Sequence, residues 1–502
     1  MCQPSGNLRQ LMNTLFLLLL LLNTFSCSDD RKENQSEIRD PFLDNLQSIA
    51  TVIPRPSSEI RSSRWGLQLN KYAVREIDLM LEKICASGVK WARVETRGYS
   101  LSPEEGYYNW TELDKIINGL VEFRINIFLC FDDSALGAWE EAPDVIDADR
   151  LKAWLIYIDK LVNRYKDQIN HWEILNEPAP VPAYADIVKK ASGMIKAIDP
   201  DGRILAGSLA RVDTGGLKFL LDQGVGPYID VVTYHPYNEF PEACKCPWYV
   251  PVRKPPGYLQ GSNLVADMRK ILAGESRRID LWQGECGYPS SEYTTSWKGR
   301  GPWGEQIQAK WLLRRFLTDF SMNIPVSVYF LLCEIPEEQG INAKGLIYHG
   351  TWEEKPAFHA LQHLTALIDE KFNDTFMPAA TFRILHEGIF FGITRENERE
   401  QAPYEDPKAP YTIQVVGLTG NEGRNALAYW LPWRMQEIIS AATVDLEVNN
   451  FGISDPVLVD LLGGQVYRPE TEVIDDVHFF RGIPLADYPL LIIEEKNVGV
   501  DL

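Results

Sequence analysis

The sequence predicts a (β/α)8 TIM barrel followed by an antiparallel β-sandwich, and three observations lead to this fold class. Short apolar runs alternate with longer amphipathic segments through residues 61–370. The apolar runs are hydrophobic at nearly every position, as expected for parallel strands buried on both faces. Beyond residue 370 the helical periodicity fades, and β-rich runs divided by Gly, Asn and Pro take its place.

The barrel is predicted from strand-like runs and the helical patterns between them. The strand-like runs are residues 65–69, 89–95, 125–131, 169–175, 203–208, 229–235, 279–284 and 326–332. Apolar residues at i, i+3, i+4 and i+7 predict amphipathic helices, for example at 72–87, 150–168, 304–322 and 355–370. A doubly wound open sheet is the alternative, but no glycine-rich phosphate loop follows the first strand.

The N-terminal residues have the features of an export signal. Arg9 gives a weakly positive start, and the apolar run at residues 15–22 is too short to span a bilayer comfortably. A small residue precedes Cys27, and this layout resembles the lipobox of bacterial lipoproteins, although Thr24 stands where an aliphatic residue is usual. The resemblance implies lipidation at Cys27; an ordinary cleaved signal peptide is the alternative.

Four segments are therefore expected. They are a signal peptide with a lipobox-like cysteine at 1–27, a polar linker at 28–60, a catalytic barrel at 61–370 and a β-sandwich accessory domain at 371–502. The linker would act as a tether. The lipobox implies an exported lipoprotein, held through Cys27 in the outer membrane of a Gram-negative bacterium and facing the periplasm or the cell surface.

Composition narrows the possible partners. Hydrophobic residues make up 45% of the 502 residues and charged residues 24%, as in soluble globular proteins. A net charge of −20 argues against nucleic acid, whose phosphates need a basic footprint, and says little about a neutral sugar. Cys244 and Cys246 could form half of a metal site, but no second His or Cys pair follows at ligand spacing. We expect neither a metal nor another cofactor, and the oligomeric state stays open.

The other cysteines are expected to be structural. Cys85 falls in a helical pattern and Cys130 in an apolar strand, so both are predicted to pack as small hydrophobic residues.

Polar residues stand where the predicted strands end, which is where a barrel of this kind carries its active site. They are Glu95, Asp132, Asp133, Asn176, Glu177, His235, Tyr237, Glu285 and Glu334. Glycosidic cleavage needs two carboxyl groups, one to protonate the leaving oxygen and one to attack the anomeric carbon or activate water. Glu177 and Glu285, on the fourth and seventh strands, would face each other across the barrel mouth. A gap of about 5 Å would predict retention of configuration, and a wider one inversion.

Two motifs carry a resemblance to a known group of enzymes. "WEILNEP" at 172–178 and "LWQGECGYP" at 281–289 resemble the strand-4 and strand-7 motifs of clan A glycoside hydrolases, which are retaining enzymes on a (β/α)8 barrel. Residues 88–120 resemble the strand-2 segment of the clan, and residues 345–361 resemble the end of its catalytic domain. Families 39 and 5 are nearest.

The resemblance implies roles for the motif residues. Glu177 would be the acid/base, with a raised pKa, and Glu285 the nucleophile, with a lowered one. Asn176 would bind the 2-hydroxyl of the sugar.

Three further residues match the support of the nucleophile in the clan. His235 and Tyr237 fit its His-x-Tyr pattern, in which the tyrosine would donate to Glu285. Arg93 would place positive charge nearby; the alternative is that it pairs with Glu173 as a structural ion pair. His235 could likewise be a satisfied core histidine.

The sugar-binding surface departs from the clan pattern in one respect. Many members have a tryptophan at the end of strand 8, whereas this chain reads "YFLLCEIPEE" there. Aromatic residues are frequent in the loops after strands 6 and 7, where they would stack on sugar rings or merely pack the loops together. They are Trp248, Tyr249, Tyr258, Tyr288, Tyr293, Trp297 and Trp303.

The resulting hypothesis is a retaining glycoside hydrolase acting on a polysaccharide or its oligosaccharides. The missing strand-8 tryptophan motivates the alternative of a non-catalytic glycan-binding surface lipoprotein on a degenerate barrel. A metal-dependent barrel hydrolase is a third class. The sugar, the linkage and the choice between exo and endo action depend on loop shapes that the sequence does not determine.

Overall fold

The computed structural model describes residues 46–501 except for several internal segments. These segments are 71–73, 97–100, 103–106, 134–135, 137–144, 243–262, 292–302, 339, 387–412 and 433–434. Cys27, Cys244 and Cys246 lie outside the described residues, as do five of the seven loop aromatics. No helix in the described part of the chain is long and apolar enough to cross a membrane.

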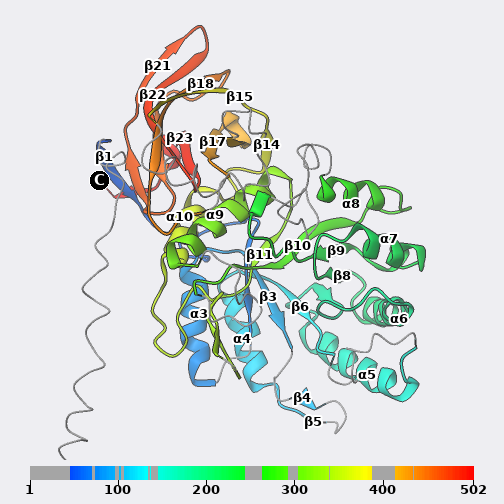
Figure 1. Cartoon of the computed structure of the whole chain (residues 1–502). Coiled ribbons are helices and arrows are strands. Elements are labelled where there is room, and N and C mark those ends of the chain that lie inside the picture. Colours follow the sequence, from blue (N-terminus) through cyan, green and yellow to red (C-terminus); the bar gives the residue numbers. More distant parts are fainter. Residues whose placement is uncertain are drawn as a thin grey trace, which may run out of the picture.

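A closed barrel of parallel strands forms the larger part of the molecule (Figure 1), which confirms the predicted fold class. Each strand coincides with one of the predicted apolar runs, because both faces of each strand are buried. The strands are β2 (Trp65–Leu69), β3 (Trp91–Glu95), β6 (Asn126–Cys130), β7 (His171–Glu173), β8 (Arg203–Leu209), β9 (Val231–Tyr234), β10 (Asp280–Cys286) and β11 (Ser327–Tyr329). Strand β11 pairs with β2 and closes the ring.

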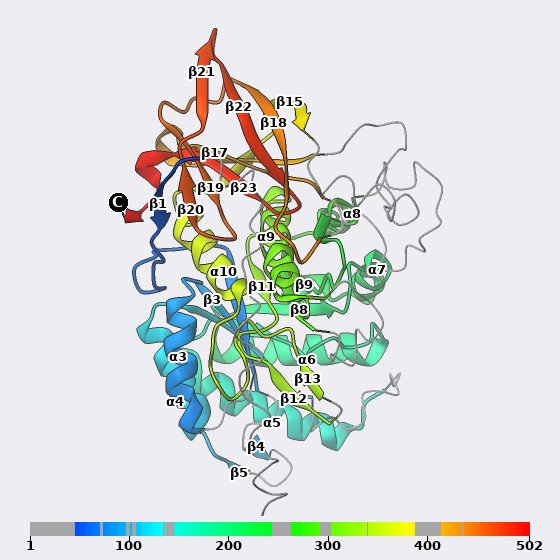
Figure 2. The same cartoon turned by 60° about the vertical axis from the view of Figure 1, so that its left-hand side comes forward.

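A helix follows each barrel strand and covers the outside of the ring (Figure 2). The helices are α3 (Ile77–Ala86), α4 (Thr111–Glu122), α5 (Ala148–Tyr165), α6 (Pro182–Ile198), α7 (Thr214–Asp222), α8 (Leu264–Leu272), α9 (Glu305–Ser321) and α10 (Pro356–Leu367). Several begin at clear sequence signals: the side chains of Asp147, Asp213 and Asn263 cap α5, α7 and α8. Two small hairpins, β4 (Leu101–Ser102) with β5 (Tyr107–Tyr108) and β12 (Ile335–Glu337) with β13 (Gly340–Asn342), lie in the loops.

The interior of the barrel has an apolar layer and a polar layer. Phe128, Leu205, Val231, Trp282 and Val328 belong to a small buried cluster of their own, separate from the main core. Two residues further along β3 and β6, toward the carboxyl ends of the strands, the interior positions are Arg93 and Cys130. The alternation along each strand thus places packed apolar side chains at the base of the barrel and polar side chains at its mouth.

Two antiparallel sheets form the C-terminal part, as predicted. The larger has the order β14 (Asp374–Phe376), β16 (Gln414–Thr419), β17 (Asn425–Trp430), β23 (Leu490–Glu494), β19 (Pro456–Asp460), β20 (Gln465–Tyr467), β1 (Ser48–Val52) and β24 (Val500–Asp501). The smaller has the order β15 (Ala379–His386), β18 (Ala441–Asn449), β22 (Val477–Ala486) and β21 (Glu470–Ile474).

Strand β1 corrects part of the predicted linker. Residues 48–52 fall inside the segment expected to be a polar tether, yet they pair with β20 and β24. Ala50 and Val52 are buried in the core, so this short alternating stretch is held by the sandwich. Its signal was hidden by the polar residues around it.

A buried ion pair and a buried hydrogen bond join the barrel to the sandwich. Arg314 on α9 makes two hydrogen bonds of 2.7 Å to Glu242, and the indole of Trp430 on β17 donates to the same carboxylate. Lys310, one turn earlier on α9, lies 2.8 Å from Asp487. Separating the two parts would break the fully buried pair of Lys310 with Asp487 and the hydrogen bond from Trp430 to Glu242.

Candidate active site

Arg93 is the centre of the polar layer at the barrel mouth. It is fully buried on β3, and its guanidinium lies 2.7 Å from carboxylate oxygens of Glu95, Glu173 and Glu285. Its Nη2 donates to Oδ1 of Asn176 at 2.8 Å. Burial opposes the charge, but Glu173 and the other acidic groups raise the pKa of Arg93 well above its ordinary value. Arg93 is therefore a permanent cation shared among several strands.

Both sequence-based interpretations of Arg93 hold. It forms the structural pair with Glu173, whose other oxygen accepts a hydrogen bond of 2.7 Å from Thr233. It also contacts Glu285, as the resemblance implied. The planar guanidinium can do both because it presents donors in several directions.

Glu285 lies at the end of β10 with donors to both of its carboxylate oxygens. Arg93 donates to Oε2 at 2.7 Å, and the Tyr237 hydroxyl donates to Oε1 at 2.5 Å. Burial raises the pKa of Tyr237 well above its ordinary value, with Glu285 adding to the shift, so the phenol stays protonated and can donate. Fixed donors of this kind hold a carboxylate in one orientation.

Glu177 leaves the end of β7 and meets His235 at the end of β9. A carboxylate oxygen of Glu177 lies 2.8 Å from Nδ1 of His235, and Nε2 of His235 lies 3.3 Å from the Ser208 hydroxyl on β8. The ring is buried, whereas 34% of the Glu177 side chain remains exposed. His235 is thus both a satisfied buried histidine and a partner of the candidate acid.

The backbone around Glu177 is held in an unusual conformation. Leu175 and Glu177 have φ values of 65° and 46°, in the left-handed region that branched and charged residues rarely adopt. Such residues cost about 1–3 kcal/mol each and persist where the surroundings over-determine them. Here the amide of Glu177 donates to Ser208 at 3.2 Å, and Pro178 follows directly. The turn after β7 thus aims Glu177 across the mouth.

Close packing explains the glycine before Glu285. A Cβ at Gly284 would lie 3.0 Å from Cβ of Thr233 and 3.3 Å from Nε2 of His235. Only glycine lets β10 approach β9 so closely that Glu285 reaches the His235 side of the mouth.

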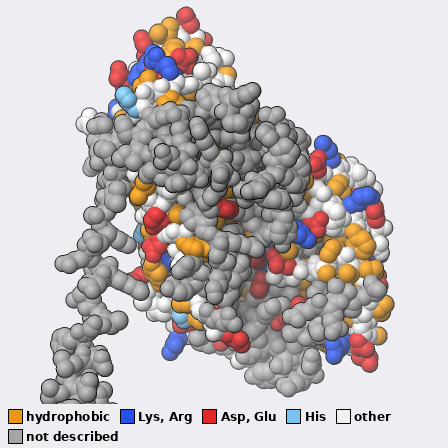
Figure 3. All heavy atoms as spheres, viewed as in Figure 1, with side chains coloured by type: hydrophobic (Ala, Val, Ile, Leu, Met, Phe, Trp, Pro, Cys, Tyr) orange, Lys and Arg blue, Asp and Glu red, His pale blue; other side chains and the backbone are white. Residues whose placement is uncertain are grey.

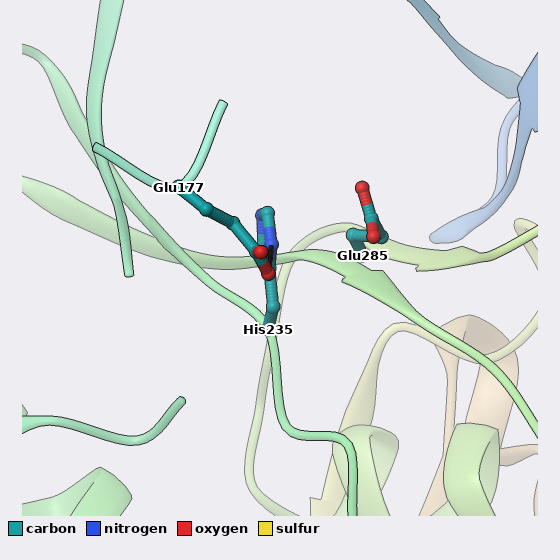
Figure 4. Close-up of side chains that lie close together, drawn as sticks. All are labelled: Glu177, His235 and Glu285. Atoms are coloured by element: carbon teal, nitrogen blue, oxygen red, sulfur yellow. Dashed lines mark hydrogen bonds and ion pairs between the residues drawn. The ribbon is translucent and has the colours of Figure 1, made fainter. Parts of the chain in front are cut away.

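Glu177 and Glu285 lie close enough to act on one bond. Figure 4 shows Glu177 reaching toward His235, with Glu285 on the other side of the imidazole. One ligand atom from each of Glu177, His235 and Glu285 lies within 4.8 Å of the others. The separation of the two carboxylates is thus at the short end of the range for paired carboxyl groups in glycosidases.

The pKa directions differ from the sequence-based expectation. Burial raises the pKa of Glu285 above its ordinary value, against the charges of His235 and Arg93. Burial would also raise the pKa of Glu177, but the His235 hydrogen bond and the charges of His235 and Arg93 bring it below its ordinary value. Burial lowers the pKa of His235, but the two glutamates outweigh it and raise the value. The expectation omitted the burial of Glu285 and the Glu177–His235 contact.

The same three side chains could approach one metal ion, but the surrounding charge disfavours a cation. Glu177, His235 and Glu285 have the donor atoms and spacing for it. Arg93, however, places a fixed positive charge 2.7 Å from Glu285. A cation there would be repelled by the guanidinium.

Other predicted strand-end residues take structural roles. Glu95 accepts hydrogen bonds from Gln68 and Arg93. Glu334 pairs with the buried ammonium of Lys355 at 2.5 Å. Asp132 follows β6 and is held by its backbone, whose carbonyl accepts the indole N–H of Trp154. Neither Glu95 nor Glu334 caps a helix.

Two of the loop aromatics lie in the described residues, and both are packed against other rings. Tyr288 is buried and stacks on Trp311, with ring centroids 5.7 Å apart. Trp303 lies 6.3 Å from the ring of Tyr288. Tyr288 and Trp303 therefore pack the loops together, which was the alternative to stacking on sugar rings.

Two residues of the site were missed by sequence reasoning. Phe330 follows β11 directly and stands edge-to-face with Tyr237, with ring centroids 6.5 Å apart. An aromatic ring thus occupies the end of strand 8, where no tryptophan is present. Lys344 lies near the same two rings, and nothing in the pattern "INAKG" distinguishes it from a loop lysine.

The fold is similar to that of known glycoside hydrolases. A family 39 glycoside hydrolase from the gut symbiont Bacteroides cellulosilyticus WH2 matches with a TM-score of 0.61 at 16% identity, over 88% of this chain and 83% of that chain. A family 39 enzyme from Xanthomonas axonopodis pv. citri matches with a TM-score of 0.52 at 14% identity, over 89% and 97%. A family 30 subfamily 8 xylanase from Clostridium acetobutylicum matches with a TM-score of 0.51 at 12% identity, over 88% and 97%.

These likenesses show that the barrel and the sandwich together form a fold found in glycoside hydrolases. The sequence itself matches no protein-family model and no curated protein. Family 39, one of the two families that the motifs resemble, is thus among the enzymes with a similar fold.

Proposed function

We propose that this protein is a retaining glycoside hydrolase that cleaves O-glycosidic bonds of a polysaccharide or oligosaccharide by double displacement. The observation that carries the proposal is the Glu177–Glu285 pair, with carboxylate oxygens within 4.8 Å at the mouth of the barrel. A short separation leaves no room for a water molecule between the sugar and the second carboxylate, which favours retention over inversion.

In the first step Glu285 attacks the anomeric carbon. The bond from this carbon to the leaving oxygen breaks, and that oxygen takes a proton from Glu177. In the second step water attacks the anomeric carbon, the bond to Glu285 breaks, and Glu177 receives a proton from the water. Glu285 is then free again, and the proton gained by Glu177 returns to the Glu177–His235 pair, which holds one proton as it did at the start.

The Glu177–His235 pair supplies the proton for the first step. With a lowered pKa on Glu177 and a raised one on His235, the proton resides on the imidazole before the reaction. It can cross the 2.8 Å hydrogen bond to Glu177 as the leaving oxygen gains charge. The pair therefore acts as one acid that holds a single proton.

Hydrogen bonds from Arg93 and Tyr237 offset the free-energy cost of burying Glu285 in its ionised form. Both donate to Glu285, so the carboxylate is oriented and partly neutralised before a substrate arrives. Asn176 is fixed through Arg93, which leaves its amide nitrogen available for the 2-hydroxyl of the sugar.

The described surface suits a substrate that is not a nucleic acid. In the view of Figure 3, Lys and Arg side chains lie scattered among Asp and Glu over the described part of the face. Together with the net charge of −20, this argues against a nucleic acid as the partner.

A glycan panel tests the proposal. The purified protein is incubated with aryl glycosides of both anomeric series and with plant and microbial polysaccharides, and the first-formed anomer is followed by proton NMR. We expect turnover with retention of configuration. Glycan binding without turnover would instead support the binding lipoprotein that the missing strand-8 tryptophan suggests. Loss of activity in excess chelator would support the metal-dependent class.

We also propose that Cys27 anchors the protein to the outer membrane of a Gram-negative cell. The apolar run before it and the small residue at position 26 support lipidation. Expression in a Gram-negative host with a labelled fatty acid should label the wild type in the membrane fraction. The variant Cys27→Ala should lose the label, and an unlabelled wild type would contradict the anchor.

A further inference from the structure

Lys344 lies against the loop that follows the candidate nucleophile. It follows β13 and is only 4% exposed, although lysine is rarely buried. A Cβ added at Gly287, two residues after Glu285, would lie 3.4 Å from Cδ of Lys344. The lysine stem therefore runs along the loop that leaves β10.

The ammonium of Lys344 lies beside the two rings that border Glu285. Its Nζ is 5.9 Å from the ring centroid of Tyr237 and 5.9 Å from that of Phe330. Tyr237 is the residue that donates to Glu285, and Phe330 stands where strand 8 ends. A sugar bound against Glu285 would thus have a cation at its side.

Acidic, aromatic and amide groups lie near Lys344. Glu337 on β12 and Glu285 on β10 both raise its pKa, and the nearest amide acceptor is Asn342 at 3.3 Å. Burial has the largest effect and lowers the pKa of Lys344 to about 8. A buried ammonium beside a reactive centre is costly, and such groups cluster at functional sites.

Lys344 adds a further positive charge near a nucleophile that already has a donor at each oxygen. Both oxygens of Glu285 already accept hydrogen bonds, from Arg93 and from Tyr237. A sugar that carries a negative group would be repelled by Glu177 and Glu285, so a site for such a sugar needs a further positive charge at its wall.

We propose that Lys344 is a specificity residue that binds an oxyanion substituent, a carboxylate or a sulfate, on the sugar that occupies the site of Glu285. This inference rests on the proposed function and names its substrate class. The ammonium forms a charge-assisted hydrogen bond to the substituent, while the rings of Tyr237 and Phe330 flank the sugar.

Matched substrates test the inference. They are 4-nitrophenyl glucosides and galactosides of both anomers, each compared with the uronide and with the 6-sulfate. The variant Lys344→Met removes the charge and keeps the length of the side chain. Lys90→Met is the matched control, because Lys90 is also buried, has a pKa lowered to about 8, and binds the Ser57 carbonyl away from the site.

We expect the wild type to prefer one anionic glycoside over its neutral counterpart. Lys344→Met should lower kcat/KM for that glycoside by about 10- to 100-fold, the loss expected for a hydrogen bond to a charged group. The neutral counterpart should change far less, and Lys90→Met should keep the wild-type preference. Preference for the uronide or for the 6-sulfate identifies the substituent. A wild type that prefers the neutral sugar, or an equal loss on both substrates in Lys344→Met, would overturn the inference.

Binding separates this inference from the proposed function. If the wild type hydrolyses none of these glycosides, the effect of glucuronate, galacturonate and glucose 6-sulfate on Tm decides for Lys344, while the wider glycan panel decides for the hydrolase proposal. A rise in Tm with one of these anions but not with glucose, lost in Lys344→Met, supports the anion site. No rise in the wild type contradicts it. The preference should also decline as pH rises through about 8, because Lys344 loses its charge there.

Discussion

Arg93 and Glu285 are joined by a hydrogen bond of 2.7 Å across the mouth of the barrel, from β3 to β10. The same guanidinium holds Glu173, so the candidate nucleophile is attached to the packed interior of the barrel through one side chain. This arrangement gives the nucleophile a fixed position, and it links the chemistry of the site to the stability of the barrel.

Replacing the acid should make the rate depend on the leaving group. Glu177→Gln removes the proton donor, so we expect kcat/KM to fall by about 10²- to 10⁴-fold for glycosides with a poor leaving group. A 2,4-dinitrophenyl glycoside needs little protonation and should lose much less. Steady-state kinetics over a series of aryl glycosides measures this, and equal losses across the series would refute the assigned role.

His235 should share the behaviour of Glu177. In His235→Gln the proton held by the imidazole is lost, so the same dependence on the leaving group should appear in a weaker form. A change confined to KM would instead show that the ring only shapes the pocket. Lys218→Met, at an exposed pair with Asp222, serves as the control.

Both limbs of the pH profile of kcat/KM should lie at higher pH than the ordinary pKa values of glutamate and histidine would give. The pKa of Glu285 is raised above 4.5 by burial, so the ionised nucleophile is lost as pH falls through a value above 4.5. The pKa of His235 is raised above 6.5 by the glutamates against its burial, so the acid is lost as pH rises through a value above 6.5. The profile of kcat/KM reports both limbs for the free enzyme. Tyr237→Phe, which removes a donor to Glu285, should move the acidic limb further up.

Neutralising Glu285 should stabilise the fold, whereas neutralising Glu173 should destabilise it. The raised pKa of Glu285 means that its ionised form costs stability above that pKa. Glu285→Gln should therefore raise Tm at neutral pH. Glu173→Gln breaks a fully buried pair with Arg93 and should cost about 3–5 kcal/mol. Calorimetry of both variants provides the comparison, and a lower Tm in Glu285→Gln would argue against a strained nucleophile.

The stability of the fold should depend on the buried pair of Arg314 with Glu242. Arg314→Met leaves Glu242 buried without its cation, and we expect a loss of about 3–5 kcal/mol in the free energy of unfolding. Arg278→Met, in which the arginine is 90% exposed, should change the same quantity by less than about 0.5 kcal/mol. Denaturant unfolding measures both, and similar values for the two would show that the buried pair does not stabilise the fold.

The barrel could be predicted because its signals are local. Each strand is an apolar run, each helix has a 3.6-residue period, and strand ends with Asn-Glu-Pro or Gly-Glu stand out in the printed sequence. Placement of Glu177 and Glu285 on facing strands then follows from the closed ring of strands.

The remaining features of the site depend on contacts between distant segments. The Glu177–His235 hydrogen bond lowers the pKa of Glu177 and burial raises that of Glu285, and no local pattern shows either contact. Lys344 belongs to a loop with no periodicity, so its approach to Tyr237 is visible only in the fold. Strand β1 similarly depends on β20 and β24 as partners far along the chain.

The most direct test of the central claim is the anomeric configuration of the azide product formed by Glu285→Ala. The shortened side chain leaves space for azide at the nucleophile position, where a single displacement would give a glycosyl azide of inverted configuration. We expect no hydrolysis without azide and the inverted azide with it, while Glu177→Ala should give the retained azide. Full hydrolytic activity in Glu285→Ala, or a retained azide from that variant, would contradict the account.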